Sequence, residues 1–139
     1  MKVVLERRFR FSSSHLYRRP QWTEEENVRA FGKCAIEPGH GHNYRLWVAV
    51  EGEPDPETGF VVDLPQLDRW VEEEVIEALD HRHINHALEE FAPGRAIPST
   101  ENLLLWILER LGASPVKGVD LVSLRLEEDE DLAASWRRR

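Results

Sequence analysis

Three histidines and one cysteine are the residues of this chain best suited to chemistry at a metal ion. His40 and His42 stand one residue apart, and His15 lies upstream at the end of Phe11-Ser-Ser-Ser-His15. Strand side chains alternate between two faces, so a His-x-His pair entering an alternating apolar segment presents both imidazoles on one face. A third imidazole from a neighbouring strand would leave one tetrahedral position open, the arrangement of a catalytic zinc. We therefore predict a Zn²⁺ site formed by His15, His40 and His42.

Cys34 is the only cysteine of the chain and lies in the same segment as the histidine pair. We interpret it as a nearby acid-base or nucleophilic group, not as a fourth ligand, because the thiolate is the reactive form of cysteine. A buried apolar role is the alternative for a lone cysteine. One cysteine excludes an intrachain disulfide, and a free thiol fits a reducing compartment, so we expect a cytoplasmic protein.

The pair Asp80-His81 is a second candidate for proton transfer. A carboxylate beside an imidazole can orient the ring and raise its basicity. The alternative is a polar helix exit, because histidine is favourable near a helix C-terminus. His83 and His86 follow in the same segment but lack the same-face spacing of His40 and His42, and we expect both to be structural or exposed.

Two further polar segments have plain structural explanations. Ser99, Thr100 and Glu101 precede an apolar periodic stretch and suit a helix start, where hydroxyls cap and carboxylates complement the helix dipole. The acidic run 127–131 follows an alternating segment and is typical of a solvated turn. One carboxylate within that run could bind the guanidine-like edge of a heterocycle.

Length, charge and hydropathy exclude several classes of protein. The 139 residues fit one domain, residues 1–139, and the net charge of −8 argues against a general nucleic-acid binder. No apolar run reaches the roughly 18 residues of a membrane span, and charged residues interrupt the N-terminus too early for a signal peptide. We therefore expect neither nucleic acid nor membrane as a partner.

Hydrophobic periodicity predicts the elements that position these residues. The alternation predicts strands and the helical spacing predicts two amphipathic helices, the first with Asp63 as N-cap and the second beginning after Ser99 or Thr100. Thr23 and Glu26 could form the capping box of a short helix within an otherwise irregular segment. The expected strands cover residues 2–12, 42–53, 119–127 and 132–136. The resulting order is ββααββ, an α+β protein.

Several separated motifs, in order along the chain, resemble those of one enzyme family. They are Phe31-Gly-Lys-Cys34, Gly39-His-Gly-His-Asn-Tyr44, Asp55-Pro-Glu-Thr-Gly59, Leu79-Asp-His81 and Ser99-Thr-Glu-Asn102. The chain resembles the 6-pyruvoyltetrahydropterin synthase family, which includes the 6-carboxytetrahydropterin synthases of queuosine biosynthesis. The resemblance implies a tunnelling fold: a four-stranded antiparallel sheet with two helices on one side. Barrels would close by oligomerisation into a homo-hexamer, a dimer of trimers, with active sites between subunits.

The resemblance also implies roles for single residues. It implies zinc ligands at His15, His40 and His42, a catalytic triad of Cys34, Asp80 and His81, and a pocket lined by Ser99, Thr100 and Glu101. Asp80 and His81 would reach the site from a neighbouring subunit. Glu128 resembles the glutamate that anchors the pterin ring; strand parity with Leu124 and Leu126 favours it, while Glu127 stays open.

The implied activity is that of a zinc-dependent lyase acting on 7,8-dihydroneopterin triphosphate. Triphosphate would be eliminated to give 6-pyruvoyltetrahydropterin or, in the queuosine branch, 6-carboxytetrahydropterin. Lys33, Arg18 and Arg19 are candidates for holding the triphosphate by position. Two alternatives stay open: an aldolase-like cleavage of the pterin side chain, with Glu37 in the cysteine segment, and a non-catalytic protein that binds metal or pterin.

Overall fold

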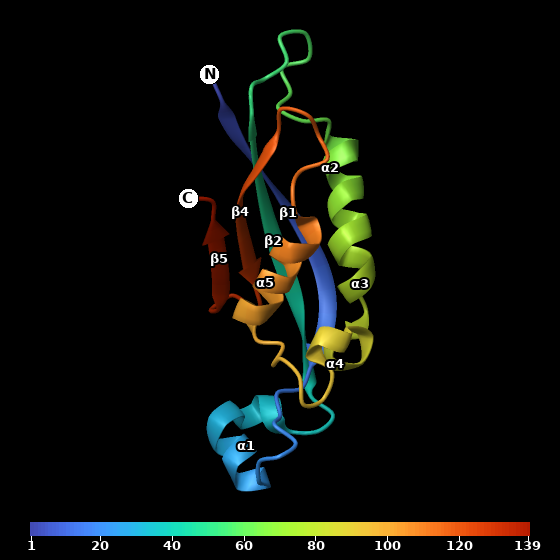
Figure 1. Cartoon of the computed structure of the whole chain (residues 1–139), viewed down its shortest axis with the longest axis vertical. Coiled ribbons are helices and arrows are strands. Elements are labelled where there is room, and N and C mark those ends of the chain that lie inside the picture. Colours follow the sequence, from blue (N-terminus) through green and yellow to red (C-terminus); the bar gives the residue numbers. More distant parts are fainter.

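A single sheet with helices on one face organises the chain in the computed structural model, which describes residues 1–139 (Figure 1). Its five strands lie in the order β3-β1-β2-β4-β5. Their bounds are Val3–His15 for β1, His40–Gly52 for β2, Arg82–His83 for β3, Asp120–Glu127 for β4 and Ala133–Arg137 for β5. The pairs β1–β2, β2–β4 and β4–β5 are antiparallel, whereas β3 pairs with β1 in parallel.

The apolar face of the sheet follows from alternation along its two longest strands. Phe9 lies opposite Leu46 and Phe11 opposite Tyr44, and all four side chains are buried on the face that the helices cover. The rings of Phe11 and Tyr44 stack with centroids 4.9 Å apart. Each large side chain buried in this way contributes about 1.5–3 kcal/mol to folding, so the register is strongly specified.

Two helical stretches cover that face (Figure 1). The first begins with α2, Leu64–Val71, capped by Asp63, and continues through a π-helical turn, Glu72–Ile76, into α3, Glu77–Leu79. The second is α5, Thr100–Leu111, capped by Ser99 and ended at Gly112. Both helices bury apolar stripes at helical spacing, as the sequence predicts.

The remaining elements gather at the end of the molecule where β1 ends and β2 begins (Figure 1). They are α1, Glu24–Phe31, the 3-10 turn Gly32–Ala35 that carries Cys34, α4, Ile84–Ala87, and a second 3-10 turn, Glu89–Phe91. The capping box of Thr23 and Glu26 is formed as predicted. This end therefore carries short elements, while the long strands and helices extend away from it.

Three expectations about the sheet need correction. β1 extends to His15, and β2 begins at His40, because the pairing of His15 with His40 continues the ladder through residues whose sequence looked irregular. The sheet has five strands and is not wholly antiparallel: β3 comprises two residues paired with Ser13 and Ser14. A two-residue strand has no alternation to detect, so only the tertiary pairing defines it.

The sheet of a single chain is open, with β3 and β5 at its edges. Closure of a barrel by several subunits therefore stays a prediction. None of the helices combines the length and hydropathy that crossing a membrane would require.

Candidate active site

The register of β1 and β2 brings three imidazoles together at one end of the helix-covered face. His15 pairs with His40 across the ladder, and Ser13 pairs with His42. Each pair of rings among His15, His40 and His42 has its centroids 4.9 Å apart. The three rings predicted from the His-x-His spacing thus surround a common point.

The donor atoms of this cluster fall into two overlapping sets that share His15. In the first, His40 Nε2 lies 3.3 Å from His15 Nε2 and 3.8 Å from Cys34 Sγ. In the second, His15 and His42 meet Glu128, whose Oε1 lies 3.9 Å from His42 Nε2. All ligand atoms within each set lie within 4.8 Å of one another. Imidazole, thiolate and carboxylate are the donors that Zn²⁺ takes in proteins.

The protonation of His15 and the surroundings of His42 fit a metal centre. Burial, and then the neighbouring His42 and His40, lower the pKa of His15 to about 3, so its ring is neutral and its lone pair available at neutral pH. His42 Nε2 is buried and has no hydrogen-bond partner. A buried polar atom without a partner is unusual in a folded protein, and a cation at the centre of the cluster would satisfy it. The residues present therefore fit a bound zinc ion.

Two tyrosine hydroxyls hold the cluster from outside. The Tyr44 hydroxyl lies 3.0 Å from His15 Nδ1, leaving Nε2 of that ring for a metal. Tyr17 donates to Glu128 Oε1 at 3.3 Å, and its ring lies 4.4 Å from that of His15. Burial raises the pKa of both hydroxyls, which stay protonated. Neither tyrosine was predicted as part of the site, although Tyr44 shares the strand parity of His42 and was identifiable from it.

Cys34 lies at the edge of the cluster, half-buried in the 3-10 turn before β2. Burial, followed by the charge of Glu128, raises the pKa of its thiol in the metal-free protein. A cation beside it would act in the opposite direction and favour the thiolate. Cys34 thus lies next to His40, and its role as a reactive group beside a metal stays a prediction.

Glu127 and Glu128 point to opposite faces of the sheet. Glu128 is buried among His15, His42 and Tyr17. Glu127 lies on the other face and accepts a hydrogen bond from Trp47 Nε1 at 2.9 Å. Of the two glutamates, only Glu128 therefore belongs to the histidine cluster, as strand parity favoured.

Asp80 and His81 form the predicted couple but are not joined to Cys34 within one chain. Asp80 Oδ2 lies 2.9 Å from His81 Nδ1, and the backbone N–H of Ser12 donates to Asp80 Oδ1 at 2.9 Å. That hydrogen bond, and then His81, lower the pKa of the carboxyl group, which is ionised at neutral pH. No hydrogen bond or ion pair connects the couple to the cluster, and the His81 side chain is 83% exposed. His81 nevertheless lines the same open groove, of about 370 Å³, as His42.

Known proteins similar to this chain identify its family. A sequence profile of 6-pyruvoyl tetrahydropterin synthase matches residues 4–139. The chain belongs to the 6-pyruvoyl tetrahydropterin synthase family. It is 37% identical to the 6-pyruvoyl tetrahydrobiopterin synthase of Pongo abelii over 94% of this chain and 88% of that protein. The 6-pyruvoyl tetrahydropterin synthase of Caenorhabditis elegans superposes with a TM-score of 0.86 at 30% identity, covering 100% of this chain and 97% of the other.

One relative carries a different activity in its name. The chain is 31% identical to a dihydroneopterin monophosphate aldolase of Pyrococcus furiosus over 94% of both proteins. Family membership identifies the chain as an enzyme of the pterin-synthase type, a lyase with a small-molecule pterin as substrate.

The other residues predicted from the family pattern lie apart from the cluster. Ser99 caps α5 through the backbone N–H of Asn102, Thr100 is buried with an unpartnered hydroxyl, and Glu101 is exposed. None of the three makes a hydrogen bond or ion pair with the histidine cluster. A role of this segment in a pterin pocket stays a prediction.

Proposed function

We propose that this protein is a zinc-dependent lyase that converts 7,8-dihydroneopterin triphosphate to 6-pyruvoyltetrahydropterin with release of triphosphate. The observation that carries the proposal is the convergence of His15, His40 and His42, with Cys34 Sγ 3.8 Å from His40 Nε2. Membership of the family supports the substrate class.

His15, His40 and His42 would hold the zinc ion, and Tyr44 would fix the ring of His15 through Nδ1. When bound, zinc supplies Lewis acidity that makes the hydroxyls of the substrate side chain more acidic. Three neutral ligands leave the ion its full charge and an open position for substrate.

Cys34 would act as a general base on the substrate side chain. Its sulfur lies at the edge of the cluster, and a proton taken from carbon would be held at Sγ. The reaction needs no external reductant, because elimination of triphosphate and an internal redistribution of hydrogen account for the product. This leaves Cys34 as the residue whose loss should abolish turnover without loss of metal.

Glu128 would recognise the pterin ring. A buried carboxylate can accept two hydrogen bonds from the amino group and ring N–H of an amino-pyrimidine edge, and both bonds would be charge-assisted. Tyr17 already holds one of its oxygens. Glu128 would thereby fix the distance between the ring and the reacting side chain.

Asp80 and His81 would serve a site completed by a second copy of the chain. Within one chain they make no hydrogen bond or ion pair to Cys34, and His81 is exposed beside an open groove. We infer a homo-hexamer, a dimer of trimers, in which this couple moves a proton at the neighbouring cluster. Pairing between subunits would also cover the strand edges that β3 and β5 leave open.

Lys33 is the best-placed cation for the triphosphate among the three expected from the sequence. It is exposed, and its side chain makes no hydrogen bond or ion pair. Arg18 and Arg19 are engaged elsewhere, with Glu24 and with the carbonyl of Arg95. A lysine ammonium suits a multiply charged leaving group as a mobile point charge.

An aldolase-like cleavage is the second candidate, favoured by the Pyrococcus furiosus relative. A carboxylate base in the cysteine segment would have to be Glu37. Its side chain is 69% exposed and lies 3.9 Å from Arg18 Nε, away from the histidines, whereas Cys34 faces them. This orientation favours the thiol as the base.

Product analysis by mass spectrometry tests the proposal. Purified zinc-loaded protein is incubated with 7,8-dihydroneopterin triphosphate, alongside Cys34→Ala. We expect 6-pyruvoyltetrahydropterin and triphosphate from the wild type and no product from Cys34→Ala, with equal zinc content. 6-Carboxytetrahydropterin with acetaldehyde would place the enzyme in the queuosine branch. Release of a two-carbon aldehyde with no tetrahydropterin formed would instead indicate the aldolase.

A further inference from the structure

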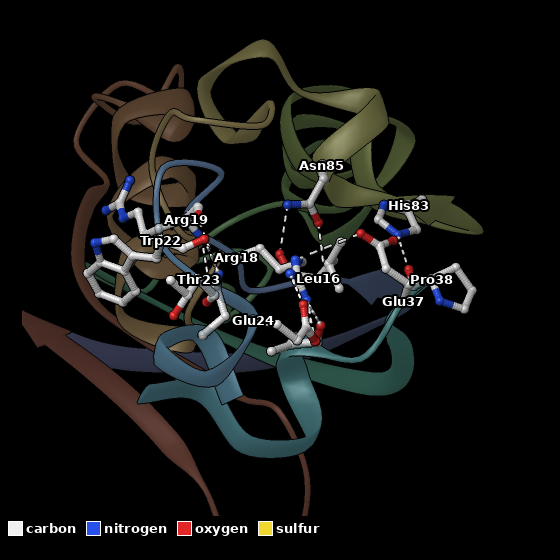
Figure 2. A network of polar contacts seen from close by, with 12 residues as sticks. Leu16, Arg18, Arg19, Trp22, Thr23, Glu24, Glu37, Pro38, His83 and Asn85 are labelled. Carbon is white, nitrogen blue, oxygen red and sulfur yellow. Dashed lines mark hydrogen bonds and ion pairs between the residues drawn. The ribbon is translucent and has the colours of Figure 1, made fainter. Parts of the chain in front are cut away.

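Arg18 lies between α1 and the loop that carries Cys34, defined here as residues 32–39 (Figure 2). Its Nη1 donates to the carbonyl oxygen of Ala35 at 2.7 Å, and its guanidinium also hydrogen-bonds the carboxylate of Glu24. Its Nε lies 3.9 Å from Glu37 Oε1. The side chain is only 22% exposed, so most of its donors face protein.

The backbone that precedes Arg18 is held to the same end of the molecule. The N–H of Tyr17 donates to the carbonyl oxygen of Cys34 at 2.8 Å. Asn85 fixes the preceding residue, Leu16, by accepting from its N–H and donating to its carbonyl, each at 2.8 Å. Two consecutive carbonyls of the Cys34 loop, at Cys34 and Ala35, are therefore held by two consecutive residues of a braced segment.

The far side of the loop has its own support. His83 Nε2 donates to the carbonyl of Pro38 at 3.0 Å, just before His40 begins β2 (Figure 2). The backbone between Ala35 and Pro38 is thus held at both ends. Release of the Ala35 contact would leave the end nearer Cys34 held by the Tyr17 N–H alone, and would leave the histidines in their ladder.

We propose that Arg18 is a positioning residue that fixes Cys34 relative to the metal site, and is not a ligand of the triphosphate. The inference rests on the proposed function for its kinetic consequence. A planar guanidinium can serve Glu24 and the Ala35 carbonyl at once, which an ammonium cannot do in the same geometry. A displacement of a reacting group by about 1 Å costs about 100-fold in rate.

The kinetic test compares Arg18→Gln and Arg18→Lys with the matched control Arg29→Gln. Arg29 also pairs with a glutamate of α1, Glu25, but its side chain is exposed and makes no hydrogen bond or ion pair with the loop. We expect Arg18→Gln to lower kcat about 100-fold, with KM and zinc content close to wild type. Arg18→Lys retains the charge and should not restore kcat. A raised KM with unchanged kcat would overturn the proposal, because it would indicate a contact to substrate.

A second measurement does not depend on turnover. Because Cys34 is the only cysteine, its alkylation by iodoacetamide at one pH can be followed by mass spectrometry on metal-free protein. We expect faster alkylation in Arg18→Gln, or in Arg18→Lys should the former fail to fold, and wild-type rates in Arg29→Gln. Equal rates in folded variants would overturn the positioning role. Faster alkylation in Arg18→Gln, combined with a wild-type protein that turns over no pterin, would retain that role and reject the proposed function.

Discussion

The six histidines form two sets of three with opposite geometries. The first set lies on neighbouring strands and converges, with ring centroids 4.9 Å apart; it comprises His15, His40 and His42. The second follows α3 along a connecting segment and has no point common to its three rings, although two of them stack on each other; it comprises His81, His83 and His86. The contrast teaches that a ladder register brings three side chains to one point, whereas closeness in sequence alone does not.

Each member of the second set has a different partner. His81 pairs with Asp80 and is exposed, and His83 donates to the carbonyl of Pro38. His86 is exposed and stacks on His83 with centroids 4.2 Å apart. His83 and His86 are thus structural or exposed, as predicted. The following predictions test the contrast, from the largest expected effect to the smallest.

His40→Ala should abolish zinc binding and turnover together. His40 is the residue whose Nε2 lies closest to both His15 and Cys34, so its loss removes a metal ligand. Removal of a group that hydrogen-bonds a metal ligand costs about 10- to 100-fold in activity, and we expect a loss of that size in Tyr44→Phe. The loss in His40→Ala should be larger. Zinc content by mass spectrometry and steady-state kinetics measure both. The matched control, His86→Ala, should bind zinc as wild type; a zinc-replete His40→Ala would contradict the assignment.

Mixed oligomers should show that His81 belongs to a neighbour's site. Cys34→Ala and His81→Ala should each lower kcat by about 100-fold or more. Co-refolding the two variants in equal amounts should restore about one quarter of wild-type activity, because some interfaces receive both intact residues. A mixture of Asp80→Asn and His81→Ala should restore nothing, since every couple lacks one member. Failure of the first mixture, with exchange of subunits verified by native mass spectrometry, would contradict a site shared between subunits and place the couple in the site of its own chain.

Two adjacent glutamates, Glu127 and Glu128, lie on opposite faces of the sheet and should differ in their effect on activity. Glu128→Gln should lower kcat/KM about 10- to 100-fold, because a charge-assisted hydrogen bond to the pterin contributes about 1.5–3 kcal/mol. Glu127→Gln, on the opposite face beside Trp47, should stay near wild type. Kinetics with 7,8-dihydroneopterin triphosphate measure the difference. A larger loss in Glu127→Gln would reverse the assignment of the anchor.

The metal-free protein should lose stability as the pH falls below about 6.5. The folded state holds the pKa of His15 at about 3, below its ordinary value of 6.5, so the unfolded state binds the extra proton. The contribution of His15 is complete above pH 6.5 and is lost progressively toward pH 3. Between pH 7 and 5 the resulting loss in the free energy of unfolding amounts to about 2 kcal/mol. Urea unfolding of chelator-treated protein measures it; His15→Gln should show a correspondingly smaller change, and equal changes would contradict the cause.

Local patterns were sufficient for much of the fold. The apolar alternation of β2, the N-cap Asp63 and the capping box of Thr23 all depend on residues close in sequence, and all were predicted; Ser99 was one of two candidate caps for α5. The two-residue β3 was not, because its hydrogen bonds to β1 join residues about 70 positions apart. The ends of β1 and β2 were also misplaced, since polar residues continue a ladder only where a partner strand lies opposite.

By itself, the sequence determined which residues could do chemistry and on which face of a strand each would lie, because side-chain parity is a local property of the backbone. It favoured Glu128 over Glu127 and selected three of the six histidines in this way. Only the tertiary structure decided that Cys34 lies beside His40 and Glu37 does not, that Tyr17 holds Glu128, and that Arg18 serves a loop. These contacts join segments whose relative placement depends on loop paths and packing, which residue periodicity does not encode.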